Sequence, residues 1–179
     1  RTAAKAGMVG AEFLAGIPGT MGGALAMNAG AFGGETWTLV RAVETVDRRG
    51  RLQRRMPVDF HIAYRTVEGP ADEWFVAAEL QLQPGDAEAA QAGIRELLAR
   101  RGATQPTQQP SCGSVFRNPP GDHAARLIES AGLKGRAVGG ACVSEKHANF
   151  IINTGTATAT DLESLIVLVR ETVERRHGI

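Results

Sequence analysis

The stretch Gly16–Gly34 reads GIPGTMGGALAMNAGAFGG and holds seven glycines, one proline and no charged residue in nineteen positions. Glycine loses more conformational freedom on folding than any other residue, so this segment is unfavourable to order. It has neither the Gly-X-Y period of collagen nor the serine-rich composition of a flexible linker. We therefore expect its bare main chain to serve a specific purpose.

Bare main chain can serve two purposes. It permits positive φ angles, and it lets main-chain N–H groups approach an anion such as a phosphate without hindrance from a Cβ atom. The segment matches neither the GxGxxG fingerprint of dinucleotide-binding folds nor the GK[ST] ending of a P-loop. A phosphate cradle and a tight structural turn therefore both remain open. Asn28, in AMNAG, is either a turn former or a ligand contact.

The bulk composition is that of an ordinary globular protein. The chain has 179 residues, of which 43% are hydrophobic and 22% charged, and its net charge is +1. This balance argues against intrinsic disorder and against a dedicated nucleic-acid surface. A group of arginines flanks Gly50, namely Arg48, Arg49, Arg51, Arg54 and Arg55. The group favours a solvated hairpin over a phosphate-binding patch.

The cysteines and histidines indicate no metal site and no disulfide framework. Cys112 and Cys142 form no CxxC pair, and the four histidines lack a spacing such as HExxH. No apolar run approaches the roughly 20 residues that cross a bilayer, and no signal peptide is evident. We therefore expect a reduced, cytoplasmic chain without metal, membrane or nucleic-acid partners. Its ends, without an initiating methionine, indicate a piece of a longer protein.

The composition changes near Pro84–Gly85, where we expect a domain boundary. Residues 1–83 are glycine-rich and strand-like. Within them the pattern predicts a hairpin over 40–47 and 51–56 and a further strand over 73–83.

The second part of the chain mixes helices with short strands. Asp86 and Asp122 are candidate N-caps for helices that end near Gly102 and Gly132. The clearest helix begins with a capping box at Thr160–Glu163. Its apolar stripe consists of Leu162, Leu165, Ile166, Val169 and Val173. Strands are expected over 112–118, 136–144 and 147–153. Because no strict βαβ repeat is present, the predicted fold class is α+β.

The segment PSCGSVFRNPPG, at Pro110–Gly121, places a serine beside a glycine at the start of a strand. Gly113 gives access to Ser114, while Val115 and Phe116 can anchor the strand. Ser114 is a candidate nucleophile, acid or plain hydrogen-bonding residue. The absence of a GxSxG elbow disfavours a hydrolase nucleophile.

The tripeptide AYR in FHIAYRTVEG supplies Tyr64 and Arg65. An arginine after an apolar run is commonly a surface residue whose stem covers apolar neighbours. Its planar guanidinium also suits a carboxylate. Both interpretations of Arg65 remain open from the residues alone.

Together these segments resemble those of the UDP-N-acetylenolpyruvoylglucosamine reductase (MurB-type) family. The segment EFLAGIPGTMGGALAMNAGAFGGE is similar to the second flavin-binding segment of that family. The AYR tripeptide, GSVFRNP and VSEKHANFIINTG recur in the same order at suitable separations. The resemblance covers about residues 10–178, and the four motifs in register make it specific.

The resemblance implies an FAD-dependent reductase of peptidoglycan synthesis in the cytoplasm, which we expect to be a monomer. In that family NADPH reduces the flavin, and hydride then passes to the enolpyruvyl double bond of the nucleotide sugar, giving UDP-N-acetylmuramate. Arg65 would hold the substrate carboxylate and stabilise its growing charge. Ser114 would deliver a proton to the α-carbon.

The family also implies a domain organisation and further site residues. Residues 1–84 would be the C-terminal part of a bipartite, PCMH/VAO-like FAD-binding domain, and residues 85–179 a smaller α+β substrate-binding domain. FAD contacts are implied for Gly19, Thr20, Gly22, Gly23, Asn28 and Gly30. Substrate contacts are implied for Tyr64, Arg117, Asn118 and His147. The family often has lysine in place of Arg117, and a structural role explains His147 equally well.

Two parts of the family pattern have no counterpart in these residues. They are the first flavin-binding subdomain and the C-terminal segment with a catalytic glutamate. We therefore expect the chain alone to bind FAD weakly or not at all and to be inactive. The alternative functions are a non-catalytic nucleotide-sugar-binding module and a flavin-dependent oxidase. The lack of a tyrosine-bearing insertion after AYR is typical of the family's shorter subtype.

Overall fold

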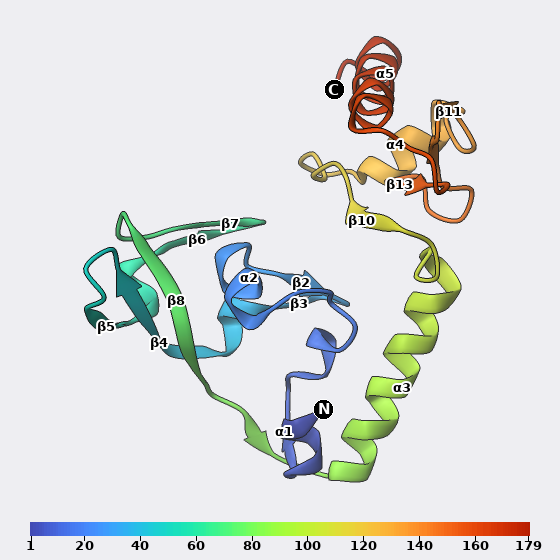
Figure 1. The fold of residues 1–179 in the computed structure, drawn as a ribbon. Coiled ribbons are helices and arrows are strands. Elements are labelled where there is room, and N and C mark those ends of the chain that lie inside the picture. Colours follow the sequence, from blue (N-terminus) through green and yellow to red (C-terminus); the bar gives the residue numbers. More distant parts are fainter. The chain divides into compact units, whose positions relative to one another are not determined.

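The structure, a computed structural model, describes residues 1–179 and divides into two compact units, Arg1–Arg100 and Arg101–Ile179 (Figure 1). All strand pairs in both units are antiparallel. Helices and antiparallel strands follow one another without βαβ crossovers, so the predicted α+β class is confirmed. The expected domain boundary at Pro84–Gly85 remains a prediction.

The first unit contains short helices and small sheets. Its helices are α1 (Thr2–Lys5), α2 (Met21–Ala26) and most of α3 (Ala87–Thr104), with 3₁₀ turns at Glu12–Leu14, Thr36–Leu39 and Pro57–Asp59. Its strands are β1 (Met8–Val9), β2 (Gly30–Ala31), β3 (Gly34–Glu35), β4 (Val40–Asp47), β5 (Leu52–Arg55), β6 (His61–Ala63), β7 (Thr66–Glu68), β8 (Glu73–Leu80) and β9 (Gln83–Pro84).

The predicted hairpin is confirmed as β4 and β5, and the predicted strand after it as β8. These strands form one sheet in the order β5-β4-β8. The hairpin turn is closed by Asp47, whose Oδ1 accepts hydrogen bonds from the main-chain N–H groups of Arg49 (2.8 Å) and Arg51 (3.0 Å). Gly50 has φ +76°, a conformation that favours glycine.

Three aromatic rings pack in one of the two hydrophobic clusters of the first unit, the one that contains the buried Leu25. The Trp37 ring lies 4.8 Å from Phe60 and 6.0 Å from Phe75, between ring centroids. The Trp37 Nε1–H donates to the Leu25 carbonyl at 2.8 Å, and Leu25 is 1% exposed. Through this bond and the buried Leu25, the core holds α2 in place.

The strand-like character expected for residues 1–83 is wrong for part of the glycine segment, which forms α2. The Thr20 hydroxyl oxygen accepts from the Gly23 N–H at 3.1 Å and caps the helix. A capping hydroxyl and a buried leucine outweigh the low helix propensity of Gly22 and Gly23.

The helix expected after Asp86 is confirmed as α3, but its end is not. Asp86 Oδ1 accepts from the N–H groups of Glu88 (2.8 Å) and Ala89 (3.2 Å), as expected for a cap. The helix continues through Gly102, which we expected to stop it, to Thr104. The ammonium group of Lys146 donates to the Gly102 carbonyl, a contact that favours a helical C-terminal turn.

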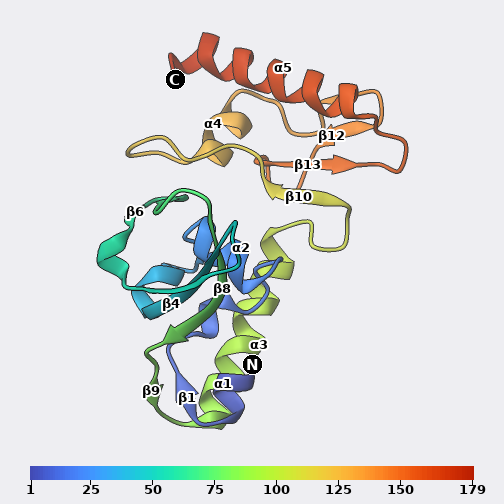
Figure 2. The same cartoon turned by 60° about the vertical axis from the view of Figure 1, so that its left-hand side comes forward.

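The second unit is a four-stranded sheet with two helices packed on it (Figure 2). The strands run in the order β10 (Ser111–Ser114), β13 (Phe150–Asn153), β12 (Ala141–Val143) and β11 (Ala137–Val138). The helices are α4 (Ala124–Ser130) and α5 (Ala159–His177). The strands expected over 112–118 and 147–153 are present but shorter than expected. The single strand expected over 136–144 is wrong, because the chain turns at Gly139 (φ +53°) and forms an antiparallel hairpin of β11 and β12. The stripe on α5 is confirmed, since Leu165, Val169 and Val173 are buried in this core.

The caps of α4 and α5 differ from the predicted ones. The α5 capping box is Thr158 with Asp161, since Thr158 Oγ1 accepts from Asp161 N–H (3.1 Å) and Asp161 Oδ2 accepts from Thr158 N–H (2.9 Å). At α4, the carboxylate of Asp122 is engaged by Arg126 and by the N–H of His123. Asn118 takes the capping role, because its Oδ1 accepts from Ala124 N–H at 3.0 Å.

Leu165→Ala should lower the free energy of unfolding of the second unit by about 2–5 kcal/mol, because a fully buried leucine leaves a cavity. Leu165 is 0% exposed. Hydrogen exchange of the α5 and β12 main-chain amides measures this loss. Leu52→Ala, at a side chain that is 64% exposed in the first unit, is the control. Equal effects of the two substitutions would contradict the assignment of Leu165 to the core.

Candidate functional site

The glycine segment contains a glycine with positive φ and a glycine in a close main-chain approach. Gly19 has φ +119°, and a Cβ added there would meet no atom within 4 Å. Gly30 is crowded instead, since its Cβ would lie 2.5 Å from the carbonyl oxygen of Gly34. The segment is therefore open at Gly19 and packed tightly at Gly30 and Gly34, where added Cβ atoms would clash.

Two hollows adjoin the open part of the segment. One of about 370 Å³ is lined by the loop before α2, including Ile17, Pro18, Gly19 and Thr20. The other, of about 430 Å³, lies between α2 and β8, with Gly22 and Gly23 in its wall. The first N–H groups of a helix have no acceptor within it. Here Thr20 occupies the N–H of Gly23, whereas Met21 and Gly22 supply the first N–H groups of α2.

Asn28 is buried within the protein. It is 1% exposed and has φ +41°. Its Nδ2 donates to Glu35 Oε2 at 2.9 Å and to the Ala63 carbonyl at 3.3 Å. Its Oδ1 accepts from the Trp37 N–H at 3.2 Å. Sequence reasoning missed Glu35, the residue directly after the glycine segment. Its carboxylate accepts the hydrogen bond from Asn28.

Arg65 lies in the turn between β6 and β7 and contacts the glycine segment. Its guanidinium donates to the carbonyls of Asn28 (3.3 Å) and Gly30 (2.9 Å). The guanidinium carbon lies 5.3 Å from the ring centroid of Tyr64, which is itself half-exposed. Arg65 is half-buried with φ +55°. The structure thus brings together the AYR tripeptide and the glycine segment, two of the three segments singled out in the sequence.

Ser114 ends β10 in the second unit and is exposed. It pairs with Phe150 across a register shift, next to Gly113 with φ +86°. After Ser114 the ladder is continued by Asn149, a buried residue that sequence reasoning missed. The Asn149 side chain accepts from Phe116 N–H at 2.9 Å and donates to the Phe116 carbonyl at 2.8 Å. The signal in the sequence that could have found Asn149 is a polar residue among the apolar residues of HANFII.

The other predicted residues of this unit have mixed surroundings. His147 is half-buried, and burial lowers the pKa of its imidazole, so the ring is neutral near pH 7. Its Nδ1 accepts from the Asn149 N–H at 3.3 Å, and its ring meets Phe150 edge-on at 4.8 Å. Arg117 and Asn118 are exposed and line an apolar hollow of about 260 Å³ beside α4 and α5.

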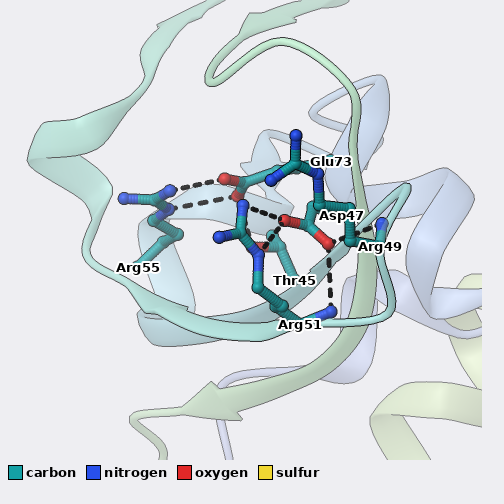
Figure 3. A network of polar contacts seen from close by, with 6 residues as sticks. All are labelled: Thr45, Asp47, Arg49, Arg51, Arg55 and Glu73. Carbon is teal, nitrogen blue, oxygen red and sulfur yellow. Dashed lines mark hydrogen bonds and ion pairs between the residues drawn. The ribbon is translucent and has the colours of Figure 1, made fainter.

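Four of the five arginines around Gly50 pair with carboxylates, and Figure 3 shows two of them, Arg51 and Arg55. Arg51 Nε donates to Asp47 at 2.7 Å, and the Arg55 guanidinium holds both carboxylate oxygens of Glu73. The Thr45 hydroxyl donates to the same Glu73 carboxylate at 2.5 Å. Arg48 and Arg54 likewise pair with Asp72 and Glu79. These ion pairs support the hairpin interpretation over a phosphate-binding patch.

Comparisons with known proteins match both parts of the chain. The family model described as "UDP-N-acetylenolpyruvoylglucosamine reductase, C-terminal domain" matches residues 105–179, and the one described as "FAD binding domain" matches residues 1–55. The UDP-N-acetylenolpyruvoylglucosamine reductase of Alkalilimnicola ehrlichii is 69% identical over 175 residues, which are 98% of this chain and 59% of that protein. The chain belongs to the UDP-N-acetylenolpyruvoylglucosamine reductase family.

Other relatives and a solved structure support the assignment to the reductase family. The reductase of Methylococcus capsulatus is 68% identical over 171 residues, which are 96% of this chain and 56% of that protein. The crystal structure of the MurB reductase from Thermus caldophilus aligns with a TM-score of 0.88 and 38% identity, covering 95% of this chain and 63% of that chain. The predicted half of a bipartite FAD-binding fold with a smaller α+β domain is confirmed.

The chain spans somewhat more than half the length of the curated relatives it matches. None of its helices has the length and apolar character that a membrane crossing requires. No group of three or more His, Cys, Asp or Glu side chains is placed to hold a metal ion.

Glu73→Gln should lower stability near neutral pH, with an effect that fades in acid. The Arg55 guanidinium, followed by the Thr45 hydroxyl, holds the pKa of Glu73 below its ordinary value. A carboxyl with a lowered folded-state pKa stabilises the fold above its unfolded pKa, and this contribution is lost as pH falls through the folded pKa. Urea unfolding should therefore show a gap between wild type and variant at about pH 7 that narrows toward about pH 3.

Glu44→Gln is the matched control for this measurement, because Glu44 lies on the adjacent strand β4 with an exposed side chain. The free energy of unfolding of the Glu44→Gln variant should follow that of the wild type across this pH range. A Glu73→Gln gap that widens in acid would contradict the ion-pair explanation.

Proposed function

We propose that the protein carrying this chain reduces the enolpyruvyl double bond of UDP-N-acetylenolpyruvoylglucosamine to give UDP-N-acetylmuramate, with FAD as cofactor and NADPH as electron donor. This is the UDP-N-acetylmuramate dehydrogenase step of peptidoglycan synthesis. The observation that carries the proposal is the contact of Arg65 with the carbonyls of Asn28 and Gly30. A carboxylate-binding side chain is thereby fixed against the segment matched by the FAD-binding model.

The glycine segment fits the diphosphate of FAD. Gly19 leaves open space where a Cβ would lie, beside a hollow of about 370 Å³. The first N–H groups of α2 are donors of the kind that bind phosphate oxygens. We propose that Gly19, Thr20, Gly22, Gly23 and Gly30 adjoin the cofactor, which supplies a hydride to the substrate when bound.

Arg65 and Ser114 have complementary roles in this proposal. Addition of hydride to the β-carbon of the enolpyruvyl group leaves negative charge on the α-carbon and the carboxylate. The Arg65 guanidinium has five N–H donors in a planar fork, and it stabilises that charge as it develops. The Ser114 hydroxyl donates its proton to the α-carbon, which completes the reduction. A serine hydroxyl is a weak acid, and the carbanion-like α-carbon is a base strong enough to take its proton.

The remaining predicted residues are proposed to bind the substrate. Tyr64 stacks beside the Arg65 guanidinium and is half-exposed. Arg117 and Asn118 follow Ser114 on an exposed segment, and Arg117 supplies a positive charge for a diphosphate. His147 is neutral near pH 7 because of burial and is a donor or acceptor rather than a cation.

The cellular setting follows from the same proposal. We infer a cytoplasmic monomer whose partner is the small nucleotide sugar. Both cysteines are free thiols, in keeping with a reducing compartment. Residues 1–84 would complete the cofactor domain and residues 85–179 the substrate domain.

Ser114→Ala in the full-length reductase should slow the substrate half-reaction by about 10²–10⁴-fold, the usual contribution of a positioned general acid. Reduction of the bound flavin by NADPH should keep its wild-type rate, because no proton transfer to the substrate is involved. Stopped-flow absorbance of the flavin, first with NADPH and then with the enolpyruvyl nucleotide sugar, separates the two steps. Ser111→Ala, at another exposed serine of β10, is the control and should change neither step.

Arg65→Lys tests the carboxylate contact in the same assay. A lysine keeps the charge but loses the planar, bidentate geometry, so the substrate half-reaction should slow and NADPH oxidation by the flavin should not. Unchanged kinetics would remove Arg65 from the site. A wild-type flavin that NADPH reduces but the nucleotide sugar does not reoxidise would overturn the proposed function.

A further inference from the structure

Asn28 uses its side-chain hydrogen-bonding groups within the protein. Both donors of Nδ2 have acceptors, the Glu35 carboxylate and the Ala63 carbonyl, and Oδ1 has the Trp37 N–H as its donor. Asn28 is 1% exposed. A side chain in this state has no group directed to a bound flavin. We propose that Asn28 is a positioning residue for Arg65 rather than a contact of the cofactor, an inference that rests on the proposed function of Arg65.

Asn28 contacts the Arg65 turn at two points. Ala63, which accepts from the Asn28 side chain, is the last residue of β6 and lies two positions before Arg65. The main-chain carbonyl of Asn28 accepts from the Arg65 guanidinium. The same residue therefore fixes the main chain before Arg65 and the tip of its side chain.

The main-chain conformation makes this support necessary. Arg65 has φ +55° and Asn28 has φ +41°, both in the left-handed region. That region is unfavourable for arginine, whereas asparagine tolerates it better. A residue in an unfavourable conformation persists when its surroundings over-determine it, and such residues gather at functional sites.

The partners also determine which way the Asn28 amide faces. An N–H group, that of Trp37, must meet the amide oxygen, and a carboxylate, that of Glu35, must meet the amide nitrogen. The reversed amide would place oxygen against carboxylate oxygen. We call Asn28 with its partners Glu35, Trp37 and Ala63 the Asn28 clamp. Within it, the Glu35 carboxylate requires a hydrogen-bond donor at position 28.

Asn28→Asp in the full-length reductase tests the Asn28 clamp, because aspartate has nearly the same shape as asparagine but no amide donor. The new carboxylate faces Glu35, and two carboxyl groups at this distance raise the pKa of the pair. At high pH, repulsion releases the Arg65 turn, and the substrate half-reaction should slow by about 100-fold, the effect of a small misplacement. As pH falls through the raised pKa, the pair shares one proton and the rate should recover. Flavin reduction by NADPH should keep its wild-type pH profile.

Two further variants separate positioning from a general loss of stability. Asn28→Asp combined with Glu35→Gln replaces the repulsive pair by an amide donor and a carboxylate acceptor, so it should recover part of the rate at high pH. In an Arg65→Ala background, Asn28→Asp should cause no further loss, because the group it positions is gone. Thr36→Val is the matched control. It removes a buried hydroxyl bond to the Ala29 carbonyl (2.7 Å) in the same segment without a contact to Arg65.

A structural readout keeps the inference testable apart from the proposed function. The Nη–H groups of Arg65, which donate to the carbonyls of Asn28 and Gly30, should exchange faster with water in Asn28→Asp than in wild type at high pH. Thr36→Val should leave this exchange unchanged. The milder Glu35→Ala removes one of the two acceptors of Asn28 Nδ2. It should also speed the exchange of the Arg65 guanidinium protons, but by less than Asn28→Asp. A failure of the wild type to reduce the nucleotide sugar would end the proposed function but leave this measurement intact.

Two outcomes would overturn the inference. The first is an unchanged Arg65 exchange in Asn28→Asp at high pH. The second is an altered flavin absorbance or equal slowing of both half-reactions, which would make Asn28 a contact of the cofactor.

Discussion

Buried asparagine amides replace regular main-chain pairing at the points where two strands end. The segments that carry Arg65 and Ser114 both depend on these amides. In the first unit Asn28 ties the end of β6 to the glycine segment, and in the second Asn149 pairs with the main chain of Phe116 beyond β10. A buried amide that is hydrogen-bonded at both its oxygen and its nitrogen holds irregular backbone in one arrangement. Arg65 lies two residues after Ala63 and Ser114 two residues before Phe116, so each stands on main chain that an amide orders.

Each unit has a separate core that supports its amide. Around Asn28 the support is aromatic, with Trp37 linking the segment to the sheet through its main-chain N–H and its ring. Around Asn149 the support is aliphatic, with Ile151 and Val143 paired on adjacent strands and both buried under α5. Burial protects the amide hydrogen bonds from competition with water and makes their loss unfavourable.

The charged groups of the hairpin serve the fold rather than ligand binding. The carboxylate of Glu73 is 10% exposed at its side chain and is satisfied by Arg55 and by Thr45. The exposed pairs, such as Arg48 with Asp72, add little because water screens them. A dense run of arginines in a sequence therefore does not indicate an anion-binding site when the fold places carboxylates next to those arginines.

Local patterns in the sequence determined the elements whose signals are local. The Asp47–Arg51 turn, the Asp86 cap and the apolar stripe of α5 each depend on residues a few positions apart, and all of them are present. The order of four short motifs was enough to indicate the family, because matching several independent segments in register is specific.

Tertiary structure decided the features that join distant residues. Asp122 had the correct residue type and position to cap α4, but Arg126 engages its carboxylate and Asn118, six residues from Ala124, takes the cap. The sequence left Asn28 open as turn former or ligand contact, and only folding places Glu35, Trp37 and Ala63 around it. A propensity describes one residue and its near neighbours. The satisfaction of a buried polar group depends on partners that the chain brings together only when it folds.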